Sequence, residues 1–271
     1  MNIYCETAGV TILALVGAAL GLWFSRLPRY YWTLGYFIPL AIIGMIGAAR
    51  WSSYFEFLPP FSWLVAGRKT FALIGFVASM VLTTPLSRLR KRRERVFVAL
   101  FLLVAVSCIS IWPFLAPAFN RTYLASLKTR IDADHICIQN TSYTCGPASA
   151  VTALRRLGFS ADEGELALLA HTSAAIGTPP TVLCQILRDR YAREGLSCQY
   201  QRFHDIKELD NGAITLAVVK FGLLVDHYVA VLEVQGDNVI VGDPLTGKDV
   251  IAFDQFRSKW RFTGVVLRRM L

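Results

Sequence analysis

The chain has 271 residues, of which 54% are hydrophobic, and its mean hydropathy is +0.45, which is too apolar for an ordinary soluble domain. The formal net charge of +9 is unevenly distributed: residues 1–119 carry eleven Lys and Arg against three acidic residues, whereas residues 120–271 carry seventeen against sixteen. Because the basic excess belongs to the apolar part of the chain, the charge does not indicate a nucleic-acid-binding protein.

Four apolar segments without Lys, Arg, Asp or Glu fill the first part of the chain: residues 8–24, 30–49, 70–86 and 96–119. Each is long enough, or nearly so, to cross a hydrocarbon core of about 30 Å. Four such segments in succession have no soluble partner to cover them, so residues 1–119 are expected to form four transmembrane helices. The first segment is not expected to be a cleaved signal peptide, because residues 1–7 contain no Lys or Arg.

A basic cluster separates the third and fourth segments and sets the expected orientation. Short basic loops remain in the cytoplasm, which places the N-terminus and everything after the fourth segment on the extracytoplasmic side. We therefore expect a multi-pass protein of the cytoplasmic (inner) membrane of a bacterium. The alternative interpretation of the cluster is a patch that binds nucleic acid or anionic lipid. The cluster consists of Arg88, Arg90, Lys91, Arg92, Arg93 and Arg95.

Residues 120–271 have the composition of one globular domain, and a cysteine begins its first predicted helix. Apolar residues recur at helical spacing from Cys145 to Leu157, and Gly158 follows as a stop signal. The positive end of a helix dipole favours the thiolate form of a cysteine, so Cys145 is a candidate nucleophile. Gln139 lies six residues upstream and carries an amide donor that could stabilise an oxyanion.

The rest of this domain has a pattern of helices followed by strands. Ser160 with Glu163 resembles a capping box for a second helix, and Pro179 with Pro180 precedes a third. This order predicts an α+β domain with a mostly antiparallel sheet. The expected strands are residues 198–202, 213–220, 227–234, 239–242, 248–253 and 262–268.

His227 is the best candidate for a general base among the four histidines. It begins the strongly apolar strand 227–234, at an end of the sheet where a site can form. Asp243 ends the next strand, and a tight hairpin would bring the two side chains together. The carboxylate would then orient the imidazole and stabilise its protonated form. Asp226 is a rival for this role, although adjacent strand residues point to opposite faces.

These residues resemble the C39 peptidase family, which has a papain-like fold and is best known for cutting leader peptides after a double glycine. The resemblance covers about residues 132–268: Gln139, the Cys145-Gly146-Pro147-Ala148 helix start, the His227-Tyr228-Val229 strand and Gly242-Asp243-Pro244. It implies that Cys145 is the nucleophile, His227 the base, Asp243 the orienting residue and Gln139 an oxyanion-hole donor. Thr144 departs from the family, whose members often have an acidic residue there.

The expected function is that of a membrane-tethered cysteine peptidase acting on a peptide or protein substrate at the extracytoplasmic side. Two alternatives stay open: a non-hydrolytic domain that recruits an export substrate, and an acyltransferase that uses the same acyl-enzyme. The expected partners are the substrate, the lipid bilayer and a separate exporter or membrane partner. No metal, cofactor or nucleic acid is expected. Cys184 and Cys198 either form a disulfide in an oxidising compartment or remain two buried thiols.

Overall fold

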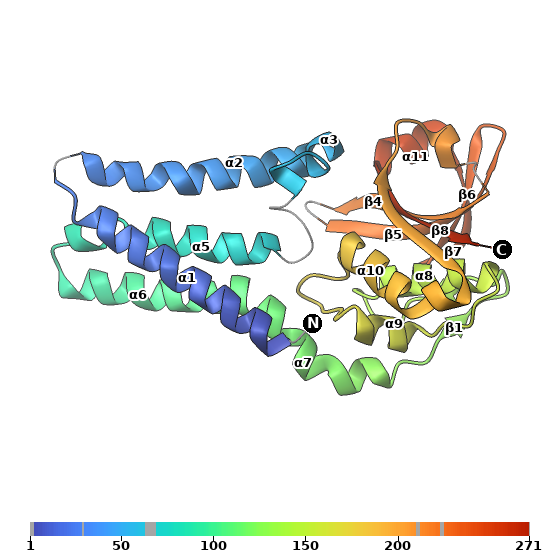
Figure 1. Ribbon diagram of the computed structural model, residues 1–271, viewed down its shortest axis with the longest axis horizontal. Coiled ribbons are helices and arrows are strands. Elements are labelled where there is room, and N and C mark those ends of the chain that lie inside the picture. The colour runs from blue at the N-terminus through green and yellow to red at the C-terminus, as the bar shows by residue number, and fades with distance from the viewer. Residues whose placement is uncertain (1–2, 29, 63–68, 210–211, 223–224, 271) are drawn as a thin grey trace. The chain divides into compact units, whose positions relative to one another are not determined.

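The computed structural model describes residues 3–28, 30–62, 69–209, 212–222 and 225–270. The chain divides into two compact units, residues 1–119 and residues 120–271, which are called unit 1 and unit 2 below (Figure 1). Each unit is described separately.

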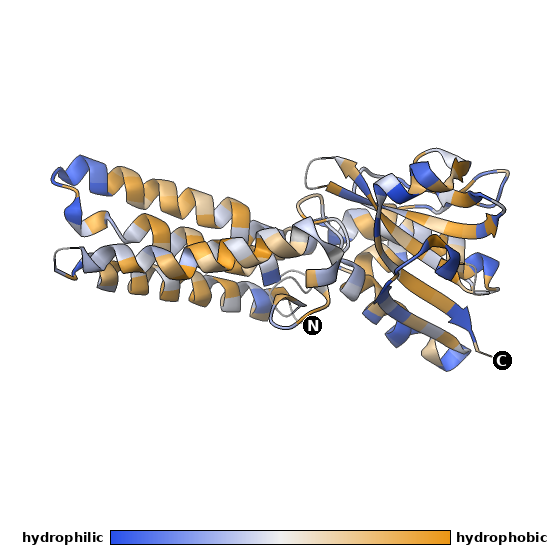
Figure 2. Ribbon diagram, turned by 90° about the horizontal axis from the view of Figure 1, so that it is seen from above, coloured by the Kyte–Doolittle hydropathy of each residue, from blue (hydrophilic) through white to orange (hydrophobic). Residues whose placement is uncertain are grey.

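The described residues of unit 1 are mainly helical. Among them, four helical segments are long and apolar enough to cross a membrane: Ile3–Ser25, Tyr31–Ala49, Lys69–Arg88 and Arg92–Ala125. Within these segments the helices are α1 (Ile3–Ser25), α2 (Phe37–Trp51), α5 (Lys69–Thr83), α6 (Arg92–Val106) and α7 (Trp112–Ala125); the short α3 spans Ser53–Glu56. Figure 2 shows apolar residues along most of their length. The four apolar helices predicted from the sequence are therefore present.

The fourth helical segment differs from its prediction at both ends. It begins at Arg92 and not near residue 96, so Arg92, Arg93 and Arg95 lie in the first turns of α6 and not in a loop. Long basic side chains can extend from a helix end toward water, so the helix need not stop where the apolar run stops. At its other end the helix continues past residue 119 to Ala125.

A π-helical stretch, Ser107–Ile111, joins α6 to α7. It ends two residues before Pro113, and Pro117 follows one turn later inside α7. Proline has no backbone N–H, so the carbonyl groups one turn earlier lose their usual donors. A local change of helical geometry accommodates this loss without ending the helix.

Helices α1 and α5 pack closely because two glycines face α5. A Cβ atom at Gly17 would overlap the carbonyl oxygen of Phe76, and one at Gly21 would overlap Oγ1 of Thr83. The Thr83 hydroxyl donates a hydrogen bond across the interface to the carbonyl of Ala18 at 3.1 Å. Small residues with interhelical hydrogen bonds are how helices associate in lipid, where no hydrophobic effect drives them together.

The C-terminal ends of α1 and α5 meet in unit 1. The Ser25 hydroxyl donates to Oγ of Ser87, which donates in turn to the Ser25 carbonyl at 2.6 Å. Arg88 donates to the carbonyl of Leu27. The turn that contains Arg26 therefore lies beside the segment that carries the basic cluster, and hydrophilic residues gather at this end of the helices in Figure 2.

Unit 2 contains a six-stranded antiparallel sheet with the strand order β3-β8-β4-β5-β6-β7. The helices α8 (Cys145–Arg156), α9 (Glu163–Leu169) and α10 (Pro180–Tyr191) precede it, and a two-stranded ladder, β1 (Arg130–Ile131) with β2 (Cys137–Ile138), lies before α8. The strands of the large sheet are β3 (Leu196–Arg202), β4 (Ile214–Gly222), β5 (Val225–Gln235), β6 (Asn238–Asp243), β7 (Gly247–Ala252) and β8 (Trp260–Arg269).

Two apolar cores cover the two faces of this sheet. On one face α8 and α10 bury residues such as Leu154 and Leu187 against β3, β4, β5 and β8. On the other face the 3-10 turn Ile206–Leu209 and helix α11 (Phe253–Lys259) bury Trp260 and Phe256. The predicted α+β order with an antiparallel sheet is confirmed (Figure 1).

One predicted helix start is wrong. The N-cap of α9 is Asp162 and not Ser160. The Asp162 carboxylate accepts a hydrogen bond from the backbone N–H of Glu165 at 3.0 Å. Asp and Ser are comparable N-caps, so the sequence pattern alone could not choose between them. Glu163 therefore does not complete a capping box, and its carboxylate is used elsewhere.

Candidate active site

His227 and Asp243 lie together at one end of the neighbouring strands β5 and β6. His227 is the third residue of β5 and is 5% exposed. Asp243 is the last residue of β6, and Nε2 of His227 lies 2.8 Å from its Oδ1. The same carboxylate oxygen accepts from the backbone N–H of Leu245, also at 2.8 Å, which holds it toward the imidazole. The predicted proximity of these two side chains is confirmed.

Cys145 is the first residue of α8 and is 8% exposed. Its thiol interacts with the side chain of His227 and helps to raise the pKa of that imidazole. Because Nε2 of the ring faces Asp243, the ring nitrogen left for the thiol is Nδ1. The structure thus brings Cys145, His227 and Asp243 into one row, with the imidazole in the middle.

The charge state of His227 reflects two opposing effects. Burial alone would lower its pKa, but the hydrogen bonds to Asp243 and Cys145, together with the charges of these two partners, raise the pKa from 6.5 to about 9. The site therefore favours a protonated imidazole near neutral pH, as a thiolate–imidazolium pair requires.

The rival orienting residue, Asp226, has a different partner. Its Oδ1 lies 2.9 Å from the guanidinium of Arg261 on β8, in a half-buried ion pair. Asp226 precedes His227 on β5, and successive strand residues alternate between the two faces. This contact supports Asp243 as the residue beside the imidazole.

Gln139 follows β2 and is 9% exposed. Its Nε2 donates to the carbonyl of Thr141 at 2.6 Å, which fixes the orientation of the amide and leaves its second N–H for another acceptor. Its backbone N–H donates to the carbonyl of Pro244 at 2.9 Å. Gln139 is therefore bound to the turn that carries Asp243. The Thr144 hydroxyl also donates to the Thr141 carbonyl, at 3.3 Å, and closes the loop before the cysteine.

Tyr228 on β5 contacts both α8 and the segment before α10. Oγ of Ser149, one turn after Cys145, donates to the carbonyl of Tyr228 at 3.0 Å. The Tyr228 hydroxyl donates to the carbonyl of Thr178 at 2.8 Å. A Cβ atom at Gly146 would lie 3.1 Å from Cβ of Thr178. The absence of a side chain at Gly146 therefore lets the segment that contains Thr178 pack closely against the residue after Cys145.

Glu163 is a functional candidate that the sequence did not reveal. It is fully buried, and its carboxylate accepts from the backbone N–H of Asn140 at 2.9 Å and from Nδ2 of Asn140 at 2.5 Å. It therefore holds the residue next to Gln139. A buried carboxylate must be hydrogen-bonded, and its partner lies 23 positions away in the chain, which no local pattern could show.

Phe221 is a second residue that the sequence did not single out. Its ring centroid lies 5.4 Å from that of His227, and the residue is 65% exposed. The hairpin of β4 and β5 brings it beside the imidazole. It offers an apolar surface next to the candidate base.

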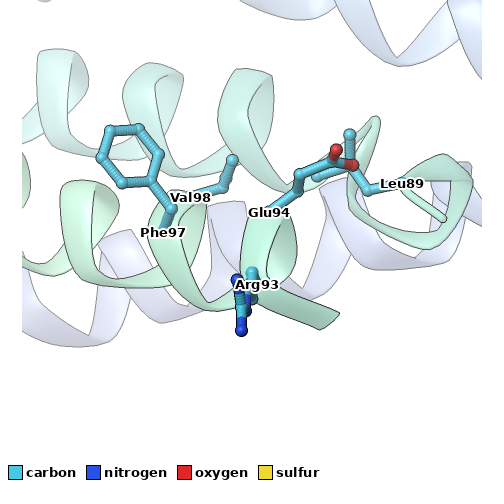
Figure 3. A pocket seen from close by; sticks show the side chains of 5 residues that line it. All are labelled: Leu89, Arg93, Glu94, Phe97 and Val98. Carbon is cyan, nitrogen blue, oxygen red and sulfur yellow. The ribbon is translucent and has the colours of Figure 1, made fainter. Parts of the chain in front are cut away.

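Other features of the described residues do not form a competing site. A hollow at the start of α6 is lined by Leu89, which precedes the helix, and by Arg93, Glu94, Phe97 and Val98. Arg93 projects away from Glu94 (Figure 3), and none of these five residues is a nucleophile. Within the described ranges, no group of three or more His, Cys, Asp or Glu is placed to hold a metal ion.

Comparison with known proteins gives a consistent result for unit 2. The sequence model of the Peptidase C39 family matches residues 134–269. An uncharacterized protein of Methanothermobacter marburgensis is 36% identical over 141 residues, which are 52% of this chain and 92% of that protein. A second uncharacterized protein, from Methanothermobacter thermautotrophicus, is 28% identical over 141 residues, which are again 52% of this chain and 92% of that protein.

Solved structures with similarity to the chain include two peptidase domains. The peptidase domain of Streptococcus ComA, a bi-functional ABC transporter of a quorum-sensing pathway, is 20% identical with a TM-score of 0.43, over 49% of this chain and 96% of that domain. A double glycine motif protease from an AMS/PCAT transporter, in complex with the leader peptide, is 15% identical with a TM-score of 0.43, over 54% of this chain and 96% of that one.

Proposed function

Because the chain belongs to the peptidase C39 family, we propose that it is a membrane-tethered cysteine peptidase that cleaves a peptide or protein substrate on the extracytoplasmic side. The observation that carries this proposal is the row formed by Cys145, His227 and Asp243. One imidazole contacts both the thiol and the carboxylate. That arrangement is what nucleophilic catalysis by a cysteine requires.

In the proposed reaction, the proton of Cys145 resides on His227 and the thiolate attacks the carbonyl carbon of the scissile peptide bond. The C–N bond then breaks, and the imidazolium gives its proton to the leaving amine. Water, deprotonated by His227, attacks the resulting thioester and releases the acid and the free thiol. Asp243 keeps the ring oriented and stabilises its positive charge throughout.

Two donors are available for the negative oxygen of the tetrahedral intermediate. One is the backbone N–H of Cys145, because the first N–H groups of a helix have no intrahelical acceptor. The other is the second N–H of the Gln139 side-chain amide. Gln139 is held by the hydrogen bond from its Nε2 to the Thr141 carbonyl and by that from its backbone N–H to the Pro244 carbonyl. Both would act electrostatically and without proton transfer.

The extracytoplasmic location is proposed from charge. The basic cluster and the turn with Arg26 lie at the same end of the unit 1 helices, which concentrates positive charge there. The positive-inside rule assigns that end to the cytoplasm. Four membrane crossings then place both the N-terminus and unit 2 outside.

The test is to replace the nucleophile in the full-length protein. Cys145→Ala should fold and insert normally but lose hydrolysis, and peptides released by cells that carry the native chain should be missing from cells that carry the variant. Mass spectrometry of secreted and membrane-derived peptides makes this comparison even while the substrate is unidentified. Identical peptide sets would refute the peptidase and leave the substrate-recruiting function as the better explanation.

The proposed triad predicts a reactive thiol at Cys145, which a binding module does not require. Iodoacetamide near pH 6 should modify Cys145 faster than the buried thiol of Cys137, whose pKa is raised to about 12, chiefly by burial. His227→Ala should slow the modification of Cys145, because it removes the proton acceptor. A rate at Cys145 that is equal in both proteins would show that the row of contacts does not activate the thiol.

A further inference from the structure

Cys184 and Cys198 form a buried pair of sulfur atoms away from the candidate triad. Cys184 lies on α10 and Cys198 on β3, two elements that pack against each other. The residues are 3% and 5% exposed, and their Sγ atoms are 2.9 Å apart. A disulfide bond is about 2.05 Å long, so a relative shift of about 1 Å would join the two atoms.

The surroundings of the pair are asymmetric. The guanidinium of Arg188, one turn after Cys184, lies 3.8 Å from Sγ of Cys184 and donates to the carbonyl of Cys198 at 3.0 Å. The hydrogen bond from Cys198 and the nearby guanidinium of Arg188 lower the pKa of Cys184, and the same contact with Cys184 raises the pKa of Cys198. One sulfur is thus suited to be the attacking thiolate and the other remains a thiol, which is the arrangement that thiol–disulfide exchange uses.

We propose that Cys184 and Cys198 are joined by a disulfide bond in the membrane-inserted protein, as an oxidative modification that fastens α10 to β3. The proposal rests on the extracytoplasmic location given above for unit 2, because disulfides persist in oxidising compartments and are reduced in the cytosol. The oxidant is a molecule with a disulfide bond, either an oxidised dithiol protein or oxidised glutathione.

The reaction proceeds by two exchanges. The thiolate of Cys184 attacks one sulfur of the oxidant, forms a mixed disulfide and releases the first thiol of the oxidant. Cys198 then loses its proton and attacks Sγ of Cys184, which releases the second thiol. Two cysteine thiols are oxidised by two electrons in total, and one disulfide of the oxidant is reduced to two thiols.

The crosslink has a structural consequence near the nucleophile. The segment before α10 contains Thr178, which accepts the hydrogen bond of Tyr228 and lies against Gly146. Fixing α10 to the sheet would anchor the C-terminal end of this segment. Cys137 has a different environment, since its Sγ lies 4.0 Å from a carboxylate oxygen of Glu163, and it serves as an internal control.

The test is a thiol map of the full-length protein taken directly from membranes. Cells are lysed in denaturant with N-ethylmaleimide and no reductant, and the protein is digested with trypsin. We expect the tryptic peptides 157–188 and 194–202 to be found linked to each other, and to separate on reduction. Peptide 131–155, which contains Cys137 and Cys145, should carry two maleimide groups.

Recovery of peptides 157–188 and 194–202 each carrying one maleimide would overturn the proposal. A second variant shows whether such a result also contradicts the extracytoplasmic location of unit 2. Asp249→Cys places a thiol on the exposed surface of β7, and a membrane-impermeant maleimide labels this thiol on intact cells only if unit 2 lies outside. Labelling of Asp249→Cys together with free thiols would refute the disulfide alone. Without labelling, the extracytoplasmic location fails as well. Cys145-dependent processing, measured on the same cells, tests the peptidase independently of both.

Discussion

At the scale of single residues, His227 links the electrostatics of the site to its pH dependence. Its pKa of about 9 lies above the usual 6.5 because Asp243 and Cys145 outweigh the effect of burial. We expect kcat/KM for a peptide substrate to fall as pH rises above about 9, when the imidazolium that protonates the leaving amine disappears. The stability contributed by the protonated histidine is complete below pH 6.5 and is lost as pH rises through about 9.

The Asp243→Asn variant tests the cause of that shift. Removal of the carboxylate should lower the pKa of His227 and move the alkaline limb of the pH–rate profile to lower pH, with a lower maximum rate. Asp237→Asn, at an exposed hairpin position, is the matched control and should leave the limb in place. An unmoved limb in Asp243→Asn would contradict the role of Asp243.

Gln139 gives a prediction about rate alone. Gln139→Glu keeps the shape of the side chain but replaces the amide donor with an acceptor, so kcat should fall about 100- to 1000-fold, as when one oxyanion-hole donor is lost. Alkylation of Cys145 by iodoacetamide should fall far less than kcat, because the thiol and its imidazole partner are intact and the added carboxylate affects only the fraction of thiolate. Gln199→Glu, exposed on β3, is the control. Equal losses of kcat and alkylation would indicate a structural role for Gln139.

The sequence predicted the positions of Cys145, His227 and Asp243 because each depends on a local pattern: a helix start, a strand start and the end of the following strand. The hairpin then brings two of them together by simple geometry. Glu163 could not be found in this way. Its burial depends on Asn140, which precedes it by 23 positions, and its own neighbourhood resembled an ordinary helix start.

At the scale of elements, the strands of the large sheet were predictable and the short elements were not. Strands such as β5 and β8 contain long apolar runs bounded by turn residues, which gives a clear signal. Helix α11 has seven residues and follows β7 without a turn, so the apolar pattern of the strand continues into its first residue, Phe253. The ladder of β1 and β2 has two residues in each strand, too few for any periodicity.

The contact between α1 and α5 gives a prediction about packing. Gly21→Leu should separate these helices, because even a Cβ atom there would overlap Oγ1 of Thr83. We expect a lower yield of folded protein and aggregation at lower temperature in mild detergent, measured by size-exclusion chromatography after heating. Gly9→Leu on the same helix is the control, since a Cβ atom at Gly9 has no neighbour within 4 Å among the described residues. Equal behaviour of the two variants would contradict this packing.

At the scale of the whole molecule, composition alone separates the two halves of the chain. Apolar runs dominate residues 1–119, and mixed polarity follows. The exact ends of the helices were less predictable, because α6 begins within the basic cluster and the last span continues to Ala125. Helix ends depend on hydrogen bonding as well as hydropathy.

The basic cluster should control membrane orientation. Replacement of Arg90, Lys91, Arg92 and Arg93 with glutamine removes most of the positive charge of the cluster, which is proposed to keep this end in the cytoplasm. The fraction of chains with unit 2 outside should therefore fall. Protease protection of unit 2 in spheroplasts measures that fraction. Replacement of four exposed basic residues of unit 2 with glutamine is the control and should leave this fraction unchanged; these residues are Arg156, Lys207, Lys248 and Lys259. An unaltered orientation in the first variant would show that other signals set the topology.

The backbone hydrogen bond from Gln139 to the carbonyl of Pro244 makes the proposed oxyanion donor and the orienting carboxylate neighbours in one loop assembly. Energetically, the two groups are therefore not independent. Loosening of the Asp243–Pro244 turn would disturb the ring of His227 and the amide of Gln139 at the same time, so the free-energy effects of substitutions at these positions should not be additive. Natural variation in this turn would then alter the whole site as a unit.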